Sequence, residues 1–90
     1  MKHGTVTAAH LDTLEIAAMI RMWSYGDVWI DTIAEQIGVT RHRAARILGG
    51  LQEVGLVHNV AVGLNLVLNL SNQWLLTYDG KKLAEHIIED

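Results

Sequence analysis

Three arginines and one histidine lie within six consecutive residues of this 90-residue chain, as Arg41, His42, Arg43 and Arg46. The chain as a whole has a formal net charge of −3, so any attraction for nucleic acid has to come from a local cluster of this kind. The planar fork of arginine matches the O6 and N7 acceptors of guanine. The cluster therefore indicates contact with the phosphates and base edges of duplex DNA, and the alternative is a solvated helix face.

Residues 40–54 carry the helical pattern that would position this cluster. We expect Thr40 to cap a helix that extends to about Val54, and Gly55 to end it. On a helical wheel one face is apolar and would enter the core, with Ala44, Ile47, Leu48 and Leu51. The opposite face carries His42, Arg46, Gly49 and Glu53, flanked by Arg43 and Gly50. The positive charge thus lies on the first half of the exposed face, where free backbone amides also favour a phosphate.

Two adjacent glycines, Gly49 and Gly50, interrupt an otherwise good helical sequence. Each costs about 1 kcal/mol against alanine inside a helix. One interpretation is that the missing side chains let DNA or another backbone approach closely. The other is that they loosen the end of a helix that packing holds in place, and the sequence leaves both open.

The segments before this helix contain two further helical patterns. The first predicts a helix over 8–23 that is capped by Thr7. This helix is apolar on two nearly opposite sides, so we expect other elements to pack against both sides, with a second subunit on one of them. A turn with a short strand is expected in "SYGDVW". The second helix is expected to begin within 30–32 and to end near Ile37, with Thr32 and Glu35 as a capping box or Asp31 as the cap. Gly38 would end this helix in a tight turn.

From Leu56 to Thr77 the apolar residues alternate with small or amide residues, with a period of two. This pattern predicts a hairpin of two strands with its turn at Gly63 or in "SNQ". The alternating apolar residues are Val60, Val62, Leu64, Leu66, Leu68 and Leu70. "QWLLT" would continue the second strand, and Thr77 would cap a last helix over 78–89.

Two stretches resemble the winged helix-turn-helix regulators of bacteria and archaea. "IAEQIGVTRHRAARILGGLQEVGLV" resembles their helix-turn-helix, and "WLLTYDGKKLAEHI" is similar to the strand-to-helix ending of the MarR and PadR type, with Leu76, Thr77, Gly80 and Leu83 in its pattern. The resemblance covers about 31–88. It implies an α+β, mainly α fold, namely a winged helix-turn-helix with a three-helix core, a β-hairpin wing and a C-terminal helix. It also implies a cytoplasmic transcriptional regulator that binds double-stranded DNA as a homodimer.

By position, the resemblance assigns DNA contact to Thr40, Arg41, His42, Arg43 and Arg46. Thr40 would contact phosphate, Arg43 and Arg46 would reach base edges, and His42 would do either. The expected hairpin departs from the family because it contains no lysine or arginine, so contact between the wing and DNA is not carried over. This departure favours the alternative function, a winged-helix protein–protein interaction module that uses the apolar hairpin and binds no DNA.

Other chemistry has little support in the sequence. There is no cysteine, and the histidines (His3, His10, His42, His58 and His86) form no close pair, so we expect no metal site and no cofactor. No carboxylates pair for acid–base work and no glycine-rich phosphate loop is present, so we expect no catalytic residues. Trp23, Trp29 and Trp74 are interpreted as core anchors, with a small-molecule pocket as the alternative.

The chain also lacks the features of secreted and membrane proteins. No apolar run approaches the length of a transmembrane helix, and the N-terminal residues contain no long apolar segment of the signal-peptide type. We therefore expect no membrane association. At this length one domain over 8–90 is expected, preceded by a short tail over 1–7.

Overall fold

The computed structural model describes residues 10–60 and 73–89. Over these residues the chain forms α1 (Thr13–Tyr25), α2 (Ile30–Ile37), α3 (Arg41–Glu53), β1 (Val57–Asn59), β2 (Trp74–Leu76) and α5 (Tyr78–Glu89). The two strands pair in an antiparallel sheet. The fold is therefore α+β and mainly helical, as predicted.

The first helix begins later than predicted. Asp12 is its N-cap, and Asp12 and Glu15 form a capping box in which each side chain accepts a hydrogen bond from the backbone amide of the other. The predicted cap, Thr7, lies outside the described residues, and the predicted start is wrong because His10 and Leu11 precede α1. The physical reason is that an acid three residues after the cap satisfies two free amides at once, whereas His10 stands three residues after Thr7.

The segment from α2 to α3 confirms the predicted helix bounds. Gly38 follows α2 in the left-handed region, with φ 77°, where glycine avoids the penalty of a side chain. Thr40 caps α3, since its hydroxyl accepts a hydrogen bond from Arg43 N at 3.1 Å. The predicted side-chain caps of α2 are wrong, because the N-cap is Trp29, which makes no side-chain cap bond. Ile30 is buried as the first residue of α2, so core packing sets this start.

The sheet brings the two ends of the expected hairpin together. Its register pairs Val57 with Leu76, His58 with Leu75 and Asn59 with Trp74. Trp29 forms an isolated antiparallel bridge with Gln73, so the short strand predicted in "SYGDVW" is reduced to a single bridging residue. The apolar alternation over 62–70 and the expected turn at Gly63 or in "SNQ" fall mostly in 61–72, outside the described residues.

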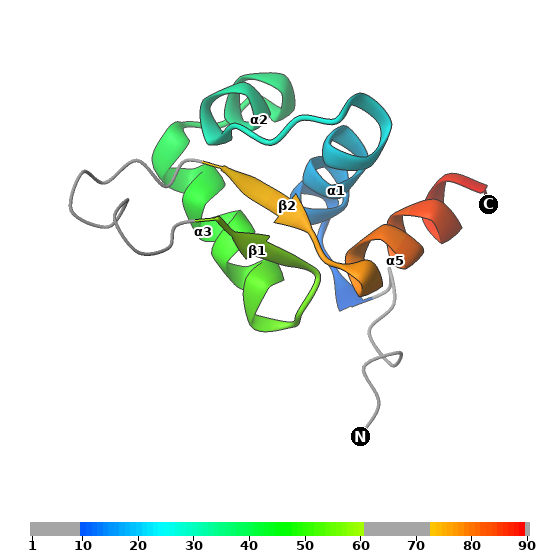
Figure 1. Cartoon of the computed structure of the whole chain (residues 1–90). Helices are drawn as coiled ribbons and strands as arrows, with labels where there is room; N and C mark the ends of the chain where they lie inside the picture. Colours follow the sequence, from blue (N-terminus) through cyan, green and yellow to red (C-terminus); the bar gives the residue numbers. More distant parts are fainter. Residues whose placement is uncertain (1–9, 61–72, 90) are drawn as a thin grey trace.

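α1 lies at the centre of the fold and contacts α2, α3, α5 and β2 (Figure 1). These elements of the same chain cover much of both apolar sides of α1, but Trp23 on the second side is 37% exposed, and cover from a second subunit stays a prediction. α3 and α5 lie on opposite sides of α1 in both views. The buried core draws on every element, with Ala18, Met19, Met22, Ile30, Ile33, Ala34, Ala44, Leu48, Leu51, Leu56, Val57, Trp74, Leu76 and Ala84.

The start of α5 is held against the chain that follows α3. Thr77 Oγ1 accepts a hydrogen bond from Gly80 N at 3.0 Å and donates one to the carbonyl oxygen of Gly55 at 2.6 Å. A Cβ at Gly80 would collide with the carbonyl group of Leu56. Thr77 and Gly80 of the C-terminal pattern therefore have a physical reason, because one caps the helix and the other allows its backbone to approach Leu56, just before β1.

Candidate nucleic-acid interface

The described part of α3 divides its side chains as the sequence predicted. Ala44, Leu48 and Leu51 are fully buried, and Ile47 packs against the core from its edge. Every predicted DNA-contacting residue is exposed to solvent, namely Thr40, Arg41, His42, Arg43 and Arg46. We call the surface formed by His42, Arg43 and Arg46 the outer face of α3. The helix holds its charged residues outward because its opposite side is locked into the core.

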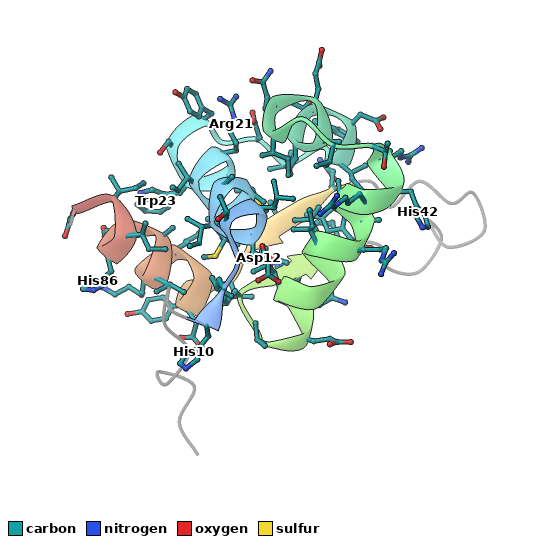
Figure 2. The ribbon with its side chains drawn as sticks, turned by 180° about the vertical axis from the view of Figure 1, so that it is seen from behind. His10, Asp12, Arg21, Trp23, His42 and His86 are labelled. Atoms are coloured by element: carbon teal, nitrogen blue, oxygen red, sulfur yellow. The ribbon has the colours of Figure 1, made fainter. Side chains whose placement is uncertain are left out.

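Different elements lie along the two flanks of the outer face. On one flank the side chain of Gln52 accepts a hydrogen bond from Asn59 N in β1 at 2.8 Å. On the other flank lies the start of α1, with Asp12 and Glu15. Figure 2 shows Asp12 at the beginning of α1 and His42 on the side of α3 away from α1. The outer face is therefore bordered by a strand on one side and by an acidic helix start on the other.

The cations of α3 differ in their partners. Arg41 Nε lies 3.2 Å from Asp31 Oδ1, with side chains that are 53% and 68% exposed. An exposed pair of this kind contributes at most about 1 kcal/mol. Arg43 and Arg46 make no ion pair within the part of the chain that the structure describes. Two guanidinium groups are thus available to an external partner.

The acidic flank of the outer face is a feature that sequence reasoning missed. Asp12 and Glu15 line a hollow of about 410 Å³ together with His42, Arg43, Arg46 and Ile47. The hollow therefore carries charges of both signs. The spacing of Asp12 and Glu15 is that of a capping box, and this pattern in the sequence could have indicated the start of α1.

The two glycines of α3 have different surroundings. A Cβ at Gly50 would lie 3.3 Å from Glu15 Oε2, so Gly50 makes room for a carboxylate of α1. A Cβ at Gly49 would meet no described atom within 4 Å. Close approach by another part of the chain therefore accounts for Gly50, and nothing in the described structure accounts for Gly49.

A second hollow lies on another part of the surface and is mainly apolar. It has a volume of about 290 Å³ and is lined by Met22, Trp23, Asp27, Val28, Trp74, Leu75, Leu76 and Lys81. We call it the apolar hollow. The interpretation of the tryptophans as core anchors is right for Trp74, which is buried, and wrong for Trp29, which is 52% exposed. Trp23 is 37% exposed and forms part of the wall of this hollow.

The described residues offer no further site of recognisable chemistry. No group of three or more His, Asp or Glu side chains among them is placed to hold a metal ion, and His3 lies outside them. None of the helices in the described ranges has the length and apolar character to cross a membrane.

No family model, curated protein or solved structure matches the chain. The function of the outer face of α3 therefore has to be inferred from its own residues and geometry.

Proposed function

We propose that this chain is a winged-helix protein that binds duplex DNA through α3 and acts as a small transcriptional regulator. The observation that carries this proposal is the exposure of Arg43 and Arg46, without an ion pair in the described structure, on the first half of the outer face of α3. This is the part of a recognition helix that meets base edges in helix-turn-helix proteins.

The order of the elements supports the winged-helix assignment. Three helices are followed by an antiparallel strand pair and a final helix, and a tight turn at Gly38 joins α2 to α3. In a winged helix the third helix enters the major groove and the hairpin lies beside it. The contact between Gln52 and Asn59 fits this arrangement, because it fixes β1 along one flank of α3.

The five candidate residues receive different roles in this proposal. Thr40 and the free amides at the start of α3 bind a phosphate. Arg43 and Arg46 reach guanine acceptors, and His42 contacts a base or a phosphate. Arg41 also contacts a phosphate, and its ion pair with Asp31 does little to oppose this because the pair is solvated.

The proposal includes a cytoplasmic location, no catalytic activity and binding as a homodimer. A dimer with one recognition helix in each subunit would bind a roughly palindromic site. Its half-sites would lie one helical turn of DNA apart, about 34–36 Å.

Titration of the full chain with a random-sequence duplex at rising salt concentration tests the proposal. Fluorescence anisotropy of a labelled duplex should show binding at low salt that weakens steeply as salt is added, because phosphate contacts release counterions. Selection from a library of randomised duplexes should then yield a preferred site. No binding at low salt, at protein concentrations up to about 100 μM, would contradict the proposal, since non-specific dissociation constants lie near or below this value.

A second candidate function, a winged-helix protein–protein interaction module, is favoured by the apolar side chains on the surface. Leu75 points outward from β2 and is 39% exposed, and Trp23 and Trp29 are exposed as well. The apolar residues of the hairpin predicted from the sequence, 60–70, lie mostly outside the described residues. Two results together would support the interaction module. The chain would bind no duplex at low salt, and it would self-associate in a way that Leu75→Lys abolishes.

A further inference from the structure

The acidic flank of α3 directly borders the cations to which the proposed function assigns DNA contact. Asp12 and Glu15 share one hollow with His42, Arg43 and Arg46. A phosphate that entered this hollow would meet two carboxylates as well as the guanidinium groups. The flank on the side of β1 presents an amide side chain, Gln52, instead of a charge.

Both carboxylates are fixed in place by the start of α1. Asp12 Oδ1 accepts a hydrogen bond from Glu15 N at 2.9 Å, and Glu15 Oε1 accepts one from Asp12 N at 3.1 Å. The second carboxylate oxygen of Glu15 lies over Gly50, where the absence of a side chain leaves room for it. The negative charge beside α3 therefore has a defined position.

No ion pair within the described residues neutralises this charge. Neither Asp12 nor Glu15 forms an ion pair with Arg43 or Arg46, although they line the same hollow. The carboxylates consequently keep their repulsion for an approaching phosphate. The arginines keep their attraction for it, and the balance depends on which part of a duplex they face.

We propose that Asp12 and Glu15 are specificity-determining residues that repel DNA phosphates from the α1 flank of α3, an inference that rests on the proposed function. Non-specific binding is almost entirely electrostatic, with arginines on phosphates, so a fixed negative charge beside them weakens it. In the proposed specific complex the arginines contact base edges in place of phosphates, so less of the affinity depends on phosphates beside Asp12 and Glu15. The acid pair therefore weakens binding to random sequence more than binding to the preferred site.

Substitution of the two acids by their amides tests this inference without removing the cap. Glu15→Gln preserves the capping box, which accepts glutamine at this position, and Asp12→Asn preserves the N-cap. Each variant should bind a random-sequence duplex about threefold more tightly at low salt, the effect of one charge at about 7 Å in water. The gain should disappear as salt is raised above about 0.5 M, because screening then acts over a few ångströms.

The readout is the ratio of affinities for the selected site and for the random duplex, measured by anisotropy with the whole chain. In both amide variants this ratio should fall by about twofold. Glu89→Gln makes the same change of charge at the far end of α5 and should leave the ratio unchanged. Thermal unfolding followed by circular dichroism checks that the variants retain the fold.

The outcomes separate this inference from the proposed function. If the unsubstituted chain binds DNA and both amide variants bind random duplex with unchanged affinity, the role of the acid pair is refuted and the proposed function stands. An equal gain in affinity for the random and the selected duplex would also refute the role of the acid pair in specificity. If the unsubstituted chain binds no duplex at low salt, the proposed function itself fails, and the inference fails with it.

Discussion

The outer face of α3 and the apolar hollow show how differently one small fold can build two surfaces. The first lies on a single helix and carries charge, whereas the second is assembled from α1, the segment before α2, β2 and the start of α5. A surface on one amphipathic helix repeats with the helical period, so the sequence reveals it. A surface assembled from separate segments has no period, and only the folded chain reveals it. The two regions can be perturbed separately, which makes the comparison testable.

The largest effect is expected at Gly80 in α5, whose neighbours Leu76 and Lys81 line the apolar hollow. Gly80→Ala places a Cβ against the backbone carbonyl of Leu56, which cannot move as a flexible side chain would. We expect the free energy of unfolding to fall by about 3 kcal/mol, the upper part of the range for overpacking. Urea denaturation measures the change. An unchanged unfolding midpoint would show that α5 does not depend on this close approach.

The next effect concerns the charged region alone. Arg46→Ala should weaken binding to the selected DNA site by about 2 kcal/mol and leave the free energy of unfolding nearly unchanged, because Arg46 is exposed and forms no ion pair in the described structure. Anisotropy titration measures the affinity. Lys82→Ala, on α5, removes the same charge on the other side of the molecule and serves as the control. Equal losses for the two variants would mean that total charge, and not the outer face of α3, determines binding.

A smaller effect is expected at Thr40, which caps α3 and is also proposed to bind a phosphate. Thr40→Ala removes the hydroxyl that accepts the hydrogen bond from Arg43 N and should lower the free energy of unfolding by about 1 kcal/mol. Thr40→Ser keeps the acceptor and should stay within about 0.5 kcal/mol of the original protein. Urea denaturation of both variants checks the difference. Equal stability of the two variants would argue against a capping role for Thr40.

The smallest effect is expected at Gly49, and it has the opposite sign. Gly49→Ala adds a methyl group in open space inside a helix and should raise the free energy of unfolding by about 0.5–1 kcal/mol. Gly50→Ala should gain less, because Glu15 has to shift by a few tenths of an ångström. Urea denaturation ranks the two variants. A larger gain at Gly50 would contradict the close approach of Glu15 to α3.

The prediction from sequence was most accurate where one local pattern determined one element. Gly38, Thr40 and the apolar period gave the bounds of α2 and α3 and the exposure of the cluster, because each acts within one turn of helix. The start of α1 was predicted wrongly because the prediction rested on a single threonine cap and overlooked the capping box of Asp12 and Glu15, which satisfies two free amides. The acidic flank depends on contact between α1 and α3, residues more than 25 positions apart, which no local pattern encodes.

The hydroxyl group of Thr77 bonds to two parts of the chain that lie far apart in sequence. It bonds to the carbonyl oxygen of Gly55, just after α3, and to the amide of Gly80 in α5. Because the bond to Gly80 lies in the first turn of α5 and moves with it, a displacement of α5 would strain the bond to Gly55 and so pull on the end of α3. The hydroxyl therefore acts as a mechanical link, through which a load on the last helix is transmitted to the helix that carries the arginines.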